Sequence, residues 1–389
     1  MVEAAGGEIV ATPDAADAAV FNSCAVTADA EADLRQSVRR AARRRPALRT
    51  VVMGCAAARD DGTIAALPTV ARVVAGAELH AVAAALGLPP ESRVPRVQTG
   101  TRALLRIQDG CDEHCTFCAT TLARGAARSR SADALVDEAT TLADRHPEIV
   151  LTGIHIGHYG IDLDSSLSAL VARLIERVPR VRFRLSSLEA TEVDDRLRDL
   201  FAHPDRLAPH VHAPLQSGSD RVLKRMGRHW YTAATYARAV ERLARDTNRF
   251  ALGADVIAGF PGETDDDHAR TVALIESLPF TYLHVFPYSV RPGTAAERLP
   301  ARVPGNVADA RARELRRLGD RCAAAHRASR LGQECDLVVI GSGARREGLT
   351  EDYLTVAVDA AVPRGTRCRA RLGGDPERLL GVPLPPIIR

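Results

Sequence analysis

The 389-residue chain has little lysine, few aromatic residues and no long apolar run. Lys224 is the only lysine among 52 basic residues, and aromatic side chains make up 4% of the sequence. Because arginine and alanine are used so heavily throughout, an arginine cluster by itself is a weak indication of a binding surface. No stretch of about 18 apolar residues is present, which excludes an ordinary membrane-spanning helix.

Targeting signals and a strong charge of one sign are missing as well. The first residues do not join a basic segment to an apolar one, so we expect no signal peptide and a cytoplasmic location. A net charge of +3 is too small to indicate a polyanionic partner by itself. In the cytoplasm, the eight cysteines are expected to be metal ligands, reactive thiols or core residues rather than a disulfide framework.

The length fits two or three domains, and the pattern divides at 1–88, 101–330 and 331–389. The first segment shows a strand at 18–21, a helix at 29–44 and a strand at 50–53, which together predict a parallel βαβ unit. The proline-containing stretch at 89–100 is typical of a linker.

Cys24 and Cys55 each follow a strand of this βαβ unit. The carboxyl ends of parallel strands meet at one edge of a sheet, where open α/β sheets bind ligands. The two cysteines are therefore candidates for a shared site, with two unrelated buried thiols as the open alternative.

The second segment alternates strands and helices. Six such repeats fit a parallel barrel or partial barrel, which a long helix at 307–330 would close. The predicted strands are 103–108, 149–152, 181–185, 210–213, 252–258 and 282–287, with helices at 132–145, 167–178, 233–245 and 265–278. The third segment has short alternating stretches separated by turns, such as 335–340, 353–358 and 366–372, which predict a small OB-like β-barrel.

Cys111, Cys115 and Cys118 form a C-x3-C-x2-C array just after the first predicted barrel strand. Loops in this position carry the active sites of barrel enzymes. Three thiolates so close together can hold a 4Fe-4S cube and leave its fourth iron without a protein ligand. A structural zinc site would need a fourth ligand, for which His114 is the nearby but sterically cramped candidate.

With Phe117 before the third cysteine, the array resembles the signature of the radical S-adenosylmethionine (SAM) superfamily. Further stretches resemble the methylthiotransferases, which add a methylthio group to tRNA or to a ribosomal protein. These stretches are 107–111 (IQDGC), 123–125 (ARG), 151–155 (LTGIH), 214–220 (PLQSGSD), 255–263 (DVIAGFPGE) and 286–289 (FPYS). The last segment is similar to their TRAM domain. The resemblance thus implies an open parallel α/β sheet, a radical SAM partial (βα)6 barrel and a terminal TRAM barrel.

One branch of these enzymes is matched more closely. This branch modifies carbon 2 of N6-threonylcarbamoyladenosine at tRNA position 37. The stretches that resemble it are 22–27 (NSCAVT), 30–31, 35–36, 151–157 and 284–289. The alternatives are the branches acting on isopentenyladenosine tRNA or on a ribosomal-protein aspartate. A further alternative is an iron–sulfur tRNA-binding protein without sulfur insertion.

The resemblance implies specific cofactors and partners. A 4Fe-4S cluster on Cys111, Cys115 and Cys118 would bind SAM, and a second, sulfur-donating 4Fe-4S cluster would use Cys24 and Cys55. The expected partners are the anticodon stem-loop of tRNA, an electron donor such as flavodoxin or ferredoxin, and a sulfur donor. The residues expected to bind SAM are Phe117, Thr152, Gly153, Ser187, Glu189, Gln216, Ile257 and Gly259. In the simpler interpretation, Gly259 only forms a turn, and Glu189 and Gln216 only cap helices.

The sequence departs from the family at its start. The family has a first strand followed by a third cysteine upstream of the Asn22-Ser23-Cys24 element, and this chain shows neither. Residues 1–10 are expected to be the tail of the first helix. We therefore expect the SAM cluster to assemble well and the second cluster poorly.

Arginines recur along the predicted helix 307–330 and in the terminal barrel, where they suit phosphate contacts of a bound RNA but equally a solvated surface. They are Arg311, Arg313, Arg316, Arg317 and Arg321, followed by Arg364, Arg367, Arg369 and Arg371. Cys322, Cys335 and Cys368 match no cluster spacing and are assigned to packing.

Overall fold

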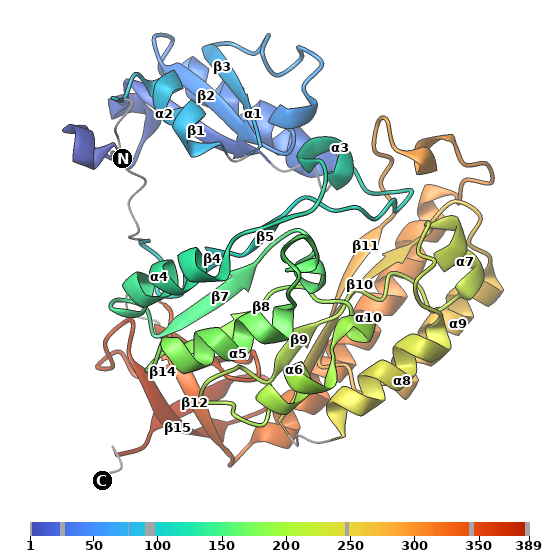
Figure 1. Cartoon of the computed structure of the whole chain (residues 1–389). Coiled ribbons are helices and arrows are strands. Elements are labelled where there is room, and N and C mark those ends of the chain that lie inside the picture. The colour runs from blue at the N-terminus through green and yellow to red at the C-terminus, as the bar shows by residue number, and fades with distance from the viewer. Residues whose placement is uncertain are drawn as a thin grey trace. The chain divides into compact units, whose positions relative to one another are not determined.

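The computed structural model describes residues 2–23, 28–76, 78–89, 98–245, 249–341 and 346–385 (Figure 1). It contains two compact units. The first comprises Met1–Arg96, Gly110–Ala126 and Ser289–Arg298, and the second comprises Val97–Asp109, Ala127–Tyr288 and Leu299–Arg389. Among the described helices, none is both long and apolar enough to span a bilayer. The cytoplasmic location stays a prediction.

The first unit is built on a parallel three-stranded sheet in the order β1-β2-β3, as expected of a βαβ start. The central strand is buried because Val51 and Val52 face opposite sides of the sheet, each covered by neighbouring apolar residues. The elements are β1 (Ala18–Ser23), α1 (Ala28–Arg44), β2 (Arg49–Gly54), β3 (Val70–Ala75), α2 (Leu79–Leu86) and α3 (Thr120–Arg124).

The expected helix tail at residues 1–10 is wrong. Glu3–Ala5 form a single 3-10 turn, and residues 7–10 are not helical. Gly6 ends the turn because its φ of +82° lies in the left-handed region, which a helix cannot continue through.

The second unit contains six parallel strands in sequence order, which confirms the predicted partial barrel (Figure 1). A bridge between Ser187 and His212 joins its two three-stranded halves. The strands are β4 (Ala103–Arg106), β7 (Glu148–Thr152), β8 (Arg182–Leu185), β9 (His210–His212), β10 (Ala251–Ala258) and β11 (Tyr282–Pro287). A short β5 (Gln108–Asp109) pairs antiparallel with β6 (Arg128–Ser129).

Helices cover the outer face of these strands, and four of them begin at a serine or threonine cap. Ser131, Ser166, Thr232 and Thr264 each accept a hydrogen bond from a backbone N–H of the first turn. Side chains alternate along a strand, so apolar residues face the helices while polar residues face inward. The helices are α4 (Ala132–Ala143), α5 (Leu167–Arg177), α6 (Asp195–Leu200), α7 (Asp220–Arg225), α8 (Ala233–Ala244), α9 (Asp265–Ser277) and α10 (Gly305–Arg330).

The C-terminal strands close into a small barrel in the order β12-β13-β14-β16-β15, as predicted. Its core includes Leu337, Val356 and Leu372, together with Cys335. The strands are β12 (Glu334–Val339), β13 (Arg346–Thr350), β14 (Thr355–Val358), β15 (Arg367–Gly374) and β16 (Leu379–Pro383).

Buried charges join this small barrel to the first residues of β7 and β8. Glu148 is fully buried and bonds Arg182 at 2.7 Å and Arg184 at 2.9 Å. Arg182 also donates to the Asp336 carbonyl at 2.7 Å, and Arg184 donates to the Thr350 carbonyl at 2.9 Å. Burial alone would raise the pKa of Glu148, but the two guanidinium groups hold it well below its usual range. The C-terminal barrel thus shares a buried ion network with the partial barrel.

Candidate active site

The cysteine loop follows β5 and is fixed at both ends. Gly110 has a φ of +76°, and a Cβ there would lie 1.9 Å from the Ala126 carbonyl oxygen, so only glycine fits. The Cys111 N–H donates to the Gly125 carbonyl at 3.1 Å, and the Cys118 N–H donates to the Cys115 carbonyl at 3.1 Å. A backbone hydrogen bond therefore closes the start of the loop, and a turn ends it.

All three cysteines of this loop are half-buried, and so is Phe117. The Thr120 N–H donates to the Cys118 sulfur at 3.3 Å, as backbone amides do toward cluster-ligating thiolates. His114, the candidate fourth zinc ligand, is exposed. Three accessible thiols on one fixed loop are the donor set that a 4Fe-4S cube with one open iron requires, so these residues fit the group.

Cys55 is half-buried at the edge of the N-terminal sheet. Its N–H donates to the Ser23 carbonyl at 3.0 Å, and Ser23 pairs with Gly54 in the parallel register. Gly54 is required there, because a Cβ would lie 2.3 Å from the Ser23 carbonyl oxygen. Cys24 lies outside the described residues.

Thr152 ends β7, Gly153 follows it, and both are half-buried. A Cβ on Gly153 would come within 3.0 Å of Gln108 Oε1. This oxygen accepts hydrogen bonds from the N–H groups of Ile154 at 3.1 Å and His155 at 2.9 Å. A Cβ at Gly153 would thus meet Ile156 Cγ2, at 2.8 Å, as well as Gln108, which the sequence indicated only as part of a motif.

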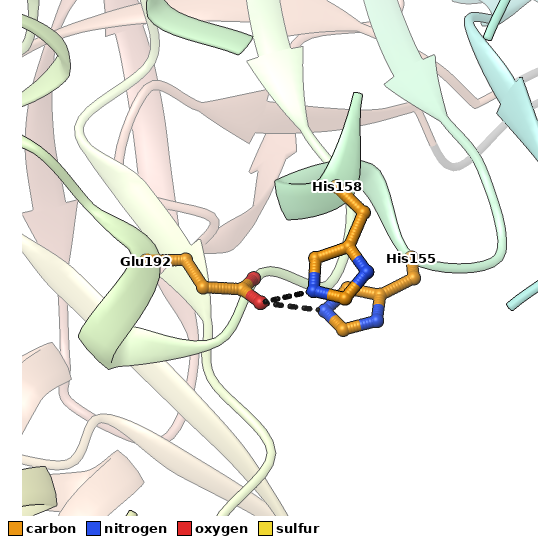
Figure 2. Close-up of side chains that lie close together, drawn as sticks. All are labelled: His155, His158 and Glu192. Atoms are coloured by element: carbon orange, nitrogen blue, oxygen red, sulfur yellow. Dashed lines mark hydrogen bonds and ion pairs between the residues drawn. The ribbon is translucent and has the colours of Figure 1, made fainter. Parts of the chain in front are cut away.

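Two strand-end loops are tied together by His155, His158 and Glu192 (Figure 2). Glu192 Oε1 lies 2.8 Å from His155 Nε2 and 3.3 Å from His158 Nε2, and the two rings stack with centroids 3.8 Å apart. Burial alone would raise the pKa of Glu192, but the hydrogen bonds from both histidines lower it to about 2. We call these three residues the loop clamp. The H-x-x-H spacing was its only sequence signal.

The next loop places Ser187 and Glu189 differently. Ser187 is exposed, whereas Glu189 is buried against Arg228. The Arg228 guanidinium also donates to the Tyr231 hydroxyl at 2.8 Å and lies over the Trp230 ring at 4.7 Å. Burial raises the pKa of Glu189 despite the opposing Arg228 charge. Glu189 is thus held by a buried ion pair, and its role toward SAM stays a prediction.

Gln216, Ile257 and Gly259 lie at the carboxyl ends of β9 and β10. The backbone of Gln216 is left-handed, with a φ of +61°, and its carbonyl accepts the Ile257 N–H at 3.0 Å. Such conformations in a residue other than glycine are concentrated at functional sites. A Cβ on Gly259 would lie 2.3 Å from the Ala308 Cβ of α10, so packing alone explains this glycine.

Most of the predicted phosphate-binding arginines have acidic or backbone partners. Arg311 is buried and bonds Glu263 at 2.8 Å, which removes it from the surface. Arg371 bonds Glu334 at 3.2 Å, Arg367 bonds Asp336 at 3.0 Å and Arg364 bonds the Thr101 hydroxyl at 2.8 Å. Arg369 also contacts Glu334. By contrast, Arg313 and Arg317 on α10 are exposed.

A groove of about 650 Å³ lies on the C-terminal barrel and contains other arginines. Arg327, Arg346 and Arg378 line it beside the apolar residues Leu380 and Val382. These arginines could not be predicted as a group from the sequence, because their grouping depends on the pairing of β14 with β16.

Comparison with known proteins agrees with this architecture. Residues 105–275 match the radical SAM superfamily, and residues 1–76 match the uncharacterized protein family UPF0004. The radical SAM methyltransferase TsrM from Kitasatospora setae, solved with cobalamin and a [4Fe-4S] cluster, superposes with a TM-score of 0.57 at 16% identity. That likeness covers 72% of this chain and 65% of TsrM, and it shows the fold alone.

Curated relatives match most of the chain. The threonylcarbamoyladenosine tRNA methylthiotransferase MtaB of Bacillus subtilis is 37% identical over 371 residues, covering 88% of this chain and 82% of the relative. MtaB of Aquifex aeolicus is 32% identical, covering 90% of each. The tRNA-2-methylthio-N(6)-dimethylallyladenosine synthase of Erythrobacter litoralis is 31% identical, covering 88% of this chain and 82% of the relative.

The partial barrel and its three-cysteine loop define a radical SAM enzyme, a class that uses an iron–sulfur cluster and SAM. Within that class, the MtaB relatives match 88–90% of this chain. The chain belongs to the MtaB family of radical SAM methylthiotransferases.

Proposed function

We propose that this chain adds a methylthio group to carbon 2 of N6-threonylcarbamoyladenosine at tRNA position 37. The main support is the 37% identity over 371 residues to a relative named for this activity, together with the fixed three-cysteine loop. Replacing an aromatic C–H by C–S needs a radical, which protein side chains do not supply. When bound, the cluster and SAM provide that radical chemistry.

The side chains of this chain then hold and orient the reactants. Cys111, Cys115 and Cys118 would ligate the cluster, with the Thr120 N–H stabilising the Cys118 thiolate. The proposed SAM contacts remain Thr152, Gly153, Ser187, Gln216 and Ile257, because they lie at or just past the carboxyl ends of barrel strands, where barrel enzymes bind substrates. Phe117, Glu189 and Gly259 complete the proposed set.

For the second cluster, we propose Cys24 and Cys55 as ligands. The Ser23–Gly54 register supports this pairing, since each cysteine directly follows one member of that pair. An external electron donor and an external sulfur donor also belong to the proposal. Two thiolates hold a cluster less firmly than three, so we expect incomplete assembly. Fewer than eight irons per chain, by chemical assay with Mössbauer spectroscopy, is the expected result; about eight would contradict it.

For tRNA, we propose that the groove on the C-terminal barrel contacts the phosphate backbone. Arg327, Arg346 and Arg378 offer individual phosphate contacts there, although the acidic Glu347, Asp359 and Glu377 line the same groove and balance its net charge. The apolar Leu380 and Val382 supply contact area. The arginines of β15 contribute less, since Arg367 and Arg371 already bond carboxylates.

Nucleoside mass spectrometry tests the activity. A strain lacking this gene should lose the 2-methylthio derivative of N6-threonylcarbamoyladenosine, and the intact gene should restore it while a Cys115→Ala gene should not. Methylthiolated isopentenyladenosine in the same sample serves as the control and should not change. Loss of that second nucleoside instead would overturn the assignment of substrate.

A further inference from the structure

Three polar side chains meet on the inner face of the partial barrel, one from each of three adjacent strands. His212 of β9 places Nε2 3.0 Å from Asp255 Oδ1 of β10, and His284 of β11 places Nδ1 3.4 Å from the same oxygen. The parallel register sets Asp255 beside His284, and His212 beside Gly253, two residues earlier on β10. We call these residues the strand triad.

We propose that the strand triad binds a divalent transition-metal ion such as Zn²⁺. Two imidazoles and one carboxylate are a common protein donor set for this class of ion. The three donor atoms all lie within 4.8 Å of one another. A single ion can therefore reach each of them at ligand distances of about 2.0–2.2 Å.

A neighbouring phenol holds one of these imidazoles in place. The Tyr282 hydroxyl lies 3.0 Å from His212 Nδ1 and 2.8 Å from His210 Nε2. Burial raises the pKa of Tyr282, so the hydroxyl keeps its proton. With Nδ1 bonded to this hydroxyl, the His212 ring presents Nε2 toward Asp255, which is how metal-binding histidines are usually oriented by a second contact.

The charge and access of the strand triad suit a cation. Burial by itself would raise the pKa of Asp255, but hydrogen bonds from His212 and His284 hold it well below its usual range, so the carboxylate is ionised. The His284 side chain is 54% exposed. Positions on the ion that the triad does not fill are therefore open to water or to an oxygen ligand, as in catalytic rather than structural metal sites.

The loop clamp has similar residues but less suitable geometry. Its rings stack face to face, with centroids 3.8 Å apart and 19° between their planes. The triad rings, by comparison, are 5.0 Å apart and tilted by 33°. The triad also stands on strands, whereas the clamp stands on loops, and strands fix ligands more precisely.

Zinc titration of the anaerobically purified, cluster-containing protein tests the proposal. We expect calorimetry to show one Zn²⁺ site, and mass-spectrometric metal counting after gel filtration to show one zinc with unchanged iron. His284→Ala should weaken zinc binding at least tenfold, because it removes one ligand from a half-exposed position. His203→Ala, which changes an exposed histidine of the same unit, should leave binding unchanged.

Two further variants separate this site from its alternatives. Tyr282→Phe should keep one zinc but weaken it about tenfold, since the phenol orients the ligand His212. His158→Ala should bind zinc like the unaltered protein, and circular dichroism melting confirms that each variant is folded. Zinc binding lost with His158→Ala but retained with His284→Ala, zinc gained at the expense of iron, or no zinc bound at all would each overturn the proposal.

Discussion

The two ends of the partial barrel are built for different tasks. At the amino end, Glu148, Arg182 and Arg184 are fully buried, paired with one another and bonded to carbonyl groups of the C-terminal barrel. At the carboxyl end, Thr152 is half-buried, Ser187 is exposed, and the loops are joined by the loop clamp. The amino end thus stabilises the fold, while the carboxyl end stays accessible, as the substrate-binding ends of barrel enzymes are.

The largest effect is expected from Glu148→Gln. The change keeps the shape but leaves two buried guanidinium groups without their counter-charge, which should cost about 3–5 kcal/mol of the free energy of unfolding. Urea unfolding measures it. Glu276→Gln is the matched control, since its pair with Arg321 is solvent-exposed and should contribute less than about 1 kcal/mol. Equal urea midpoints for the two variants would contradict the role of the buried charges at the amino end in stabilising the fold.

A smaller loss of stability, with a larger loss of binding, is expected from Gly157→Ala at the opposite end. The new Cβ would lie 1.8 Å from Glu192 Oε2 and must displace the loop clamp. We expect SAM affinity to fall about tenfold while the fold is retained, measured by equilibrium binding and circular dichroism. Gly373→Ala, where a Cβ meets nothing within 4 Å, is the control. A stable variant with unchanged SAM affinity would show that the clamp does not serve the proposed SAM site.

The loop clamp should also show a defined dependence on pH. The folded-state pKa of Glu192 is about 2, below its ordinary value, so its carboxylate stabilises the fold above about pH 4.5 and this contribution is lost as the pH falls toward 2. The difference in urea midpoint between the unaltered protein and Glu192→Gln should shrink as the pH falls from about 4.5 toward 2. A difference that grows over this range contradicts the assigned sign.

The smallest effects concern RNA contacts. Arg346→Ala in the groove should weaken tRNA binding and reduce the salt dependence of its affinity by about one phosphate contact. Arg371→Ala should do less, because Arg371 is already paired with Glu334. Filter binding at several salt concentrations compares them. A larger loss of tRNA binding from Arg371→Ala than from Arg346→Ala would instead place the RNA-binding surface on β15.

Local patterns predicted most of the strands and helices. The strands β7 to β11 were predicted within one or two residues, because each is a short apolar or alternating run bounded by helix caps. By contrast, β3 and α2 were not predicted, since their alanine-rich sequences fit either periodicity. Residues 1–10 were wrongly assigned to a helix.

Local sequence patterns did not predict which distant side chains meet in the folded chain. Glu148 meets Arg182, and His212 meets Asp255 and His284, only through the register of strands tens of residues apart. The cysteine loop, by contrast, could be selected from sequence, because all three of its cysteines lie within eight residues. Proximity along the chain decided which parts of the site were predictable.

The hydrogen bonds from Arg184 to the carbonyl oxygens of Thr350 and Glu351 limit how modular this enzyme is. In a chain shortened at residue 330, these donors beside Glu148 would be exposed or left without acceptors. A terminal barrel from another protein would need carbonyl acceptors at matching positions. Exchange of the last 59 residues between related enzymes should therefore succeed only when the residues that face β7 and β8 travel with them.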